Sequence, residues 1–202
     1  MRFRSLILLA LFGTCLAVPA AFADGDPASD YLITQQIFLP LAVPYSTADG
    51  GALTNMLNDA KTKNFPLKVA VISRRDDLGS VPSLYGQPQS YASFLAQEDY
   101  NFWKNELLVV MPQGYGLSKV KGLPAADKAV VAKLTPPRVT SGDGLIAAAE
   151  RAVQALAARR GLKLSTESTS ASAENHDRVE IAVGVLVLAA LGFGVRMVVR
   201  RR

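Results

Sequence analysis

Apolar and polar positions divide the central part of the chain into short apolar runs and longer helical stripes. Residues 31–39 are rich in strand-forming side chains and end at Pro40, while residues 67–73 and 107–111 are short and largely apolar. Continuous apolar runs of this length are typical of strands that are buried on both faces. We therefore expect three strands, of which the second and third are buried.

Helical stripes follow these strands. Ser46 and Asp49 have the spacing of a capping box before the first stripe, and further helices are expected over 90–98 and 124–134. Asp143 is the expected cap of the last helix, whose stripe is the clearest: Leu145, Ile146, Ala149, Val153, Leu156 and Ala157. Strands that alternate with helices predict an α/β fold, a three-layer sandwich around a small parallel or mixed sheet.

The amino-terminal residues 1–23 have the pattern of a signal peptide. Arg2 and Arg4 precede a short apolar stretch over 6–18, and small residues at Ala21 and Ala23 offer a cleavage site. The alternative is an uncleaved anchor. The sequence therefore predicts a secreted domain over 24–164.

The carboxyl-terminal part has the pattern of a membrane span. Residues 179–199 form a 21-residue segment with Glu180 and Arg196 near its edges, and a helix of that length spans about 31 Å. The arginines at 200–202 indicate the cytoplasmic side. Residues 165–178 contain no large apolar side chain, so we expect a flexible tether. The prediction is a single-pass protein of the cell membrane, in contact with lipid through 179–199 and with its α/β domain outside the cytoplasm.

Charge and rare residues narrow the chemistry. The chain has 22 Lys+Arg and 17 Asp+Glu, but residues 24–178 contain 16 of each, so the central region is neutral. A neutral domain gives no electrostatic reason to expect nucleic acid as a partner. Cys15 and His176 are the only residues of their kinds and lie in the predicted signal and tether. A Ser-His-Asp or Cys-His nucleophile pair, a thiol redox motif and an ordinary zinc site are therefore not expected in the domain.

The order of the motifs resembles that of the TPM domain family, whose members are membrane-tethered extracytoplasmic proteins of bacteria and thylakoid-lumen proteins. The resemblance covers roughly residues 46–161 and rests on these segments in order: 69–72, Asp77-Leu78-Gly79, Ser90-Tyr91, 107–110 and Gly114-Tyr115-Gly116-Leu117. It departs from the family at Ser118, where the family has a Glu, and in the hairpin before Gly114, which is nearly absent here.

Three loops are expected at the carboxyl ends of the strands, where open α/β sheets bind ligands: 46–49, 74–79 and 113–117. Asp76 and Asp77 could hold Ca²⁺ or Mg²⁺, but a cation shell needs more oxygens than these two residues supply, which favours a solvated turn. Gly114, Tyr115 and Gly116 are a candidate ligand loop, with Tyr115 as a hydrogen-bonding lid, or else a tight turn. Phe102 and Trp103 are expected in the core or at its rim.

The sequence favours a binding function over catalysis. The resemblance implies an interaction, assembly or quality-control module for envelope or membrane proteins. One alternative is a metal-dependent phosphatase, an activity that the resemblance also implies, which needs Asp76, Asp77 and Asp143 to converge on a cation. A second alternative is a small-ligand-binding domain with a pocket at the strand ends.

Overall fold

The structure is a computed structural model that describes residues 25–167 of the 202-residue chain. The predicted signal peptide (1–23), membrane span (179–199) and basic stub (200–202) lie outside the described residues, as does the tether beyond residue 167. Within residues 25–167, no helix is both long enough and apolar enough to cross a membrane.

The described residues form a mixed α/β fold around one sheet of four strands in the order β1-β2-β3-β4. The strands are β1 Ile37–Phe38, β2 Leu67–Val71, β3 Glu106–Met111 and β4 Gly114–Ser118. The helices are α2 Pro27–Thr34, α3 Thr47–Thr62, α4 Pro88–Glu98, α5 Ala125–Ala132 and α6 Gly142–Arg159, and short 3-10 turns are η1 Arg75–Leu78, η2 Pro82–Leu84 and η3 Asp99–Asn101. β1, β2 and β3 are parallel and β4 is antiparallel to β3, so the predicted small sheet is a mixed one.

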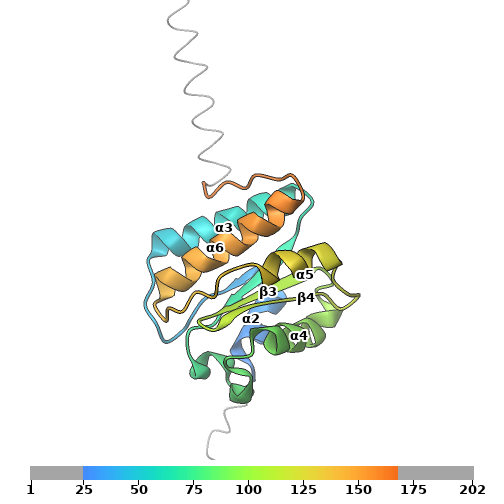
Figure 1. Ribbon diagram of the computed structural model, residues 1–202. Coiled ribbons are helices and arrows are strands. Elements are labelled where there is room, and N and C mark those ends of the chain that lie inside the picture. The colour runs from blue at the N-terminus through green and yellow to red at the C-terminus, as the bar shows by residue number, and fades with distance from the viewer. Residues whose placement is uncertain (1–24, 168–202) are drawn as a thin grey trace, which may run out of the picture.

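Helices cover both faces of the sheet (Figure 1). On one face α3 and α6 lie side by side, and α2 and α4 pack on the other face. Each face has its own apolar core, because alternate residues of β2 and β3 point to opposite sides. Val69 and Leu108 point into the core under α3 and α6, whereas Ala70 and Val109 point into the core over α2 and α4.

The two connections between the parallel strands have opposite hands. Since β1, β2 and β3 are neighbours in chain order, both connections cross the sheet in the same direction. However, α3 links β1 to β2 on one face and α4 links β2 to β3 on the other. One of the two crossovers is therefore left-handed, against the usual rule. This arrangement places α3 next to α6 and leaves the other face to α2 and α4.

The buried strands and the helix of 47–62 confirm their predictions, but the strand predicted over 31–39 is wrong. Residues 27–34 form α2 instead, and the strand β1 is limited to Ile37–Phe38. Pro27 begins the helix, and Ala28 and Leu32, one turn apart, are buried against the sheet. Packing of these two side chains outweighs the strand preference of the residues that follow.

Candidate functional site

Asp77, one of the two predicted metal ligands, holds the loop after β2 in place. Its carboxylate accepts hydrogen bonds from the backbone N–H of Ser73 (2.8 Å), of Arg74 (2.9 Å) and of Leu41 (3.2 Å). The hydroxyl of Ser73 donates a fourth at 2.8 Å. The side chain is 1% exposed. Four donors use the acceptor capacity of a carboxylate, so in this structure Asp77 acts on its own backbone.

The structure does not bring the three predicted carboxylates together. Asp76 is exposed at the surface of η1, and Asp143 lies at the start of α6. Within residues 25–167 there is no group of three or more His, Cys, Asp or Glu that could hold a metal ion. The geometry therefore offers no support for the predicted Ca²⁺ or Mg²⁺ site.

The prediction that Asp143 caps α6 is wrong, because Ser141 occupies the N-cap position. Its carboxylate instead accepts a hydrogen bond of 2.6 Å from the backbone N–H of Ser46. Ser46 is itself the cap of α3, with its hydroxyl oxygen accepting from the N–H of Ala48. Asp143 thus fills the role predicted for Asp49, and it joins the starts of α3 and α6.

The predicted turn at 113–117 is also wrong, because Gly114, Tyr115 and Gly116 lie in β4. They pair with β3 in an antiparallel hairpin that turns at Pro112 and Gln113. Gly116 is needed for packing, since a Cβ atom there would lie 2.0 Å from the carbonyl oxygen of Pro88 in α4. A glycine in this strand therefore lets the start of α4 approach the sheet closely.

The side chain of Gln89 covers the outer edge of β4. Its amide nitrogen donates to the carbonyl oxygen of Leu117 at 3.0 Å, and its amide oxygen accepts from the N–H of Leu117 at 3.1 Å. These two bonds replace the bonds that a further strand would make. An edge strand covered in this way is protected from pairing with another chain.

Tyr115 lies between two hollows of about 460 and 450 Å³, each of which it lines. We call the surface formed by both hollows the Tyr115 groove, and its lining residues are Gln89, Tyr115, Leu117, Lys128, Val131, Ala132, Lys133, Leu134, Thr135, Pro136, Pro137 and Arg151. The groove lies beside β4 and is lined by residues of α4, α5, the loop that directly follows α5, and α6. It includes Tyr115 of the predicted ligand loop.

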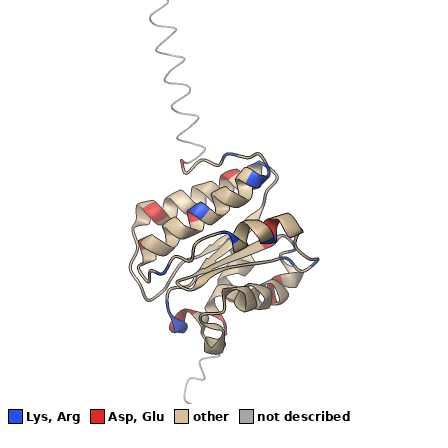
Figure 2. Cartoon of the chain, viewed as in Figure 1, with Lys and Arg blue, Asp and Glu red and all other residues tan. Residues whose placement is uncertain are grey.

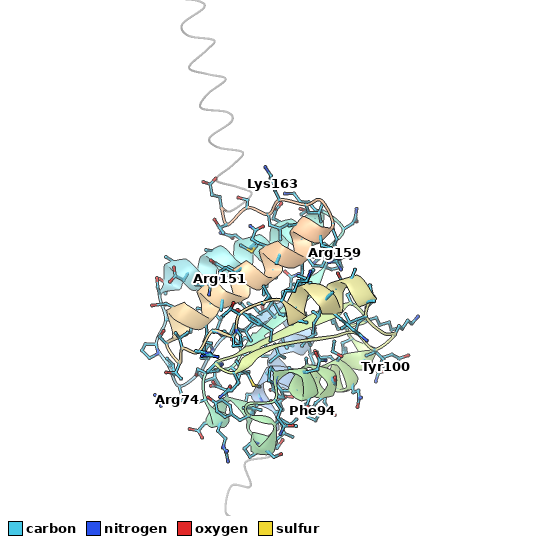
Figure 3. The ribbon with its side chains drawn as sticks, in the orientation of Figure 1. Arg74, Phe94, Tyr100, Arg151, Arg159 and Lys163 are labelled. Atoms are coloured by element: carbon cyan, nitrogen blue, oxygen red, sulfur yellow. The ribbon has the colours of Figure 1, made fainter. Side chains whose placement is uncertain are left out.

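Three cations line the Tyr115 groove, and none of the described lining residues is a carboxylate. Lys128 and Lys133 come from α5 and its carboxyl end, and Arg151 projects from α6 (Figure 3). All three side chains are exposed. Residues far apart in the sequence thus give one surface a single sign of charge, which favours an anionic ligand.

Burial raises the pKa of the Tyr115 hydroxyl, and the positive charge of Arg151 lowers it in part. The hydroxyl therefore keeps its proton at neutral pH. A protonated phenol can donate a hydrogen bond to a ligand oxygen. The centre of the groove thus adds a donor to the three surrounding cations.

A buried ionic network fixes α5 and with it one wall of the groove. Asp127 is fully buried and contacts Arg159 and Arg160 at the end of α6, the second at 2.9 Å. Arg160 also binds both carboxylate oxygens of Glu106 at 2.8 Å, and its guanidinium lies 4.1 Å from the ring centroid of Phe65. The network therefore fixes the position of α5, which carries Lys128, relative to α6, which carries Arg151.

Asp26 is a further buried acid, which no sequence pattern singled out. It accepts a hydrogen bond of 2.6 Å from the hydroxyl of Tyr91, while its other carboxylate oxygen is buried without a partner. Burial raises the pKa of Asp26 to about 6. The pair lies between α2 and α4, away from the groove, and joins the amino-terminal segment to the core.

No family model, curated protein or solved structure matches the chain. The resemblance to the TPM family therefore stays a prediction.

Proposed function

We propose that the chain is a membrane-tethered extracytoplasmic interaction module, similar to TPM domain proteins, that assists the assembly or quality control of envelope or membrane proteins. In this proposal the α/β domain binds an acidic segment of its partner in the Tyr115 groove. The tether and the span over 179–199 keep the domain at the membrane.

The observation that carries the proposal is the composition of the groove. Lys128, Lys133 and Arg151 surround the Tyr115 hydroxyl, with no carboxylate among the described lining residues. Apolar side chains of Val131 and Leu134 complete the lining. An acidic segment with neighbouring apolar residues fits both kinds of surface, because cations attract it and apolar area holds it.

The phosphatase and the small-ligand-binding domain, the two alternative functions, differ in how well the geometry supports them. The phosphatase needs carboxylates that converge on a cation, and within residues 25–167 no such group is present. A small anion is the second candidate ligand, because each hollow is within the size range of small-molecule sites.

Crosslinking in living cells tests the proposal. A photo-reactive amino acid at Ala132, which is exposed and lines the groove, is expected to capture a protein of the envelope or membrane. The same amino acid at Asn58, exposed on α3, serves as the control position. Capture from Ala132 should fall several-fold in Arg151→Glu and stay unchanged in Arg75→Glu, which alters the same charge on the distant η1.

Two results would contradict the proposal. Equal capture from Ala132 and Asn58 would mean that the groove has no special affinity for partners. Capture that is insensitive to Arg151→Glu would mean that charge complementarity plays no part. Absence of any captured protein, together with binding of inorganic phosphate that Arg151→Glu weakens, would favour a small anion instead.

A further inference from the structure

One end of the domain combines exposed aromatic side chains with lysines. Phe102 is 64% exposed and Tyr100 is 43% exposed, although the sequence analysis expected Phe102 in the core or at its rim. Val120 is 40% exposed. Lys104, in the loop before β3, and Lys121, in the loop after β4, are also exposed. Large apolar side chains are exposed elsewhere too, such as Leu41 at 66%, so what distinguishes this set is the presence of lysines among the aromatic rings.

These residues lie together because β3 begins where β4 ends. Leu107 pairs with Ser118 at the end of the ladder, which places the loop before β3 beside the loop after β4. Asn105 and Lys119 line one hollow of about 210 Å³, so the two loops are neighbours. We call this surface the aromatic-lysine end, formed by Tyr100, Phe102, Lys104, Lys119, Val120 and Lys121.

Further cations border the aromatic-lysine end. Asn64 and Arg160 line the same hollow as Asn105, so the ends of α3 and α6 lie beside it. Figure 2 shows basic residues in the connection between β4 and α5 and at the end of α6. Lys61 and Lys163 are exposed on the same side, whereas Lys63 is paired with Asp59 at 2.8 Å and donates to the carbonyl oxygen of Lys163.

The acids at this end are largely neutralised inside the protein. Asp99 is 1% exposed and lies 3.6 Å from the ammonium of Lys68. Glu106 is 5% exposed and binds Arg160. The surface that remains is cationic and aromatic, with Glu98 as an exposed acid at the end of α4.

We infer that the aromatic-lysine end rests on an anionic lipid bilayer. Aromatic rings with a polar edge prefer the interface between headgroups and acyl chains, and each nearby lysine is attracted to anionic lipids. Exposed Phe102 would enter the interface while Lys104 and Lys121 contact headgroups. The inference goes beyond the tether of the proposed function, because it assigns the domain itself a membrane-facing side.

The length of the tether permits this orientation. After α6 the backbone turns back along α3, where Lys63 donates to the carbonyl oxygen of Lys163 and Asn55 donates to that of Thr166, and the described chain ends at Glu167. The predicted span begins at residue 179, so only about a dozen residues separate the domain from the bilayer. A tether of that length keeps the domain close enough for this end to touch lipid.

Trp103, the only tryptophan of the chain, provides the test. Its indole N–H donates to the carbonyl oxygen of Glu106 at 3.0 Å, and Lys68 lies 4.8 Å from its ring centroid. The ring is therefore fixed next to Phe102. The full chain is reconstituted in bilayers of brominated phosphatidylcholine, with or without phosphatidylglycerol, and Trp103 fluorescence is measured.

The expected result is loss of fluorescence in the bilayers that contain phosphatidylglycerol and little loss in phosphatidylcholine alone. The paired substitutions Lys104→Glu and Lys121→Glu should restore the emission, as should high salt. The matched pair Arg74→Glu and Arg75→Glu, exposed on η1, should not. Thermal unfolding of each variant checks that the fold is kept.

Equal quenching with and without phosphatidylglycerol would overturn the inference, because the tether alone would then explain it. Absence of quenching in both bilayers would overturn the inference as well.

Extraction at alkaline pH reports separately on membrane insertion. Failure of insertion refutes the predicted span, whereas quenching that depends on phosphatidylglycerol would still support the aromatic-lysine end.

Discussion

The Tyr115 groove and the aromatic-lysine end are both cationic, but they differ in what supports them. The groove is backed by rigid contacts: Gly116 against Pro88, Gln89 on Leu117, and the network around Asp127. The aromatic-lysine end consists of loop residues whose side chains project outward, and Phe102 is 64% exposed.

This difference separates two kinds of recognition. A preformed hollow selects a ligand by shape as well as charge, because little ordering is required on binding. Exposed aromatic and basic side chains on loops suit a fluid lipid surface, which has no fixed shape to match. If this distinction is correct, substitutions in the supports of the groove should cost stability, and substitutions at the aromatic-lysine end should not.

The largest expected effect is that of Gly116→Val. A side chain there would overlap the backbone of Pro88 and Gln89, at 2.0 Å and 2.7 Å from its Cβ atom. The backbone of α4 would have to move, at a cost of about 3 kcal/mol or more in the free energy of unfolding. Denaturant unfolding measures it. Gly51→Ala, with open space around its Cβ, should instead stabilise α3 by about 0.5–1 kcal/mol.

Asp127→Ala should have the next effect. It would leave Arg159 without its buried partner and Arg160 with Glu106 alone, and should lower the free energy of unfolding by about 3 kcal/mol. Asp76→Ala, which removes an exposed carboxylate, should change it by less than about 0.5 kcal/mol. Equal losses in the two variants would show that the network does not support α5.

Asp26→Asn tests how a buried carboxyl group outside both the Tyr115 groove and the aromatic-lysine end contributes to the pH dependence of stability. Since the pKa of Asp26 is raised to about 6 in the folded protein, the folded state holds a proton that the unfolded state releases. The contribution of Asp26 to the free energy of unfolding is therefore greatest at low pH. It falls by at most about 3 kcal/mol as the pH rises towards about 6.

The Asn side chain does not titrate, so its variant should lack this part of the pH dependence. Unfolding curves of both proteins between about pH 4 and pH 7 provide the comparison. Asp99 and Glu106 titrate in both proteins, and burial raises the pKa of each, so their effect cancels. Parallel pH profiles for the two proteins would contradict the assignment.

The smallest expected effect on stability is that of Phe102→Ser. With 64% of the side chain exposed, its removal should change the free energy of unfolding by no more than about 0.5 kcal/mol. Tyr91→Ser, which removes a fully buried ring, is the contrasting variant and should cost more than about 3 kcal/mol. A large loss for Phe102→Ser would place that ring among the structural residues.

Much of the fold could be predicted because its signals are local. The apolar runs of β2 and β3 and the stripe of α6 are each contained within one segment. The helix α2 was missed because only Ala28 and Leu32 carry its stripe, while β-branched and aromatic residues favoured a strand.

Most residues of the Tyr115 groove could not be predicted from the sequence. Tyr115 was singled out, but as part of a turn. Lys128 and Arg151 were not, because they are separated along the chain and meet only when α5 and α6 pack together. Asp77 was a candidate metal ligand because it adjoins Asp76, and its actual donors, which include the N–H of Leu41, come from backbone that no sequence pattern identifies.

The most direct measurement is a titration of the full chain, held in phosphatidylcholine nanodiscs, with a fluorescent glutamate-rich peptide and a lysine-rich peptide of the same length. The proposal predicts binding of the acidic peptide alone, weakened by Lys133→Glu together with Arg151→Glu and unaffected by Arg75→Glu. Equal affinity of the unaltered chain and the groove variant for the acidic peptide would contradict it.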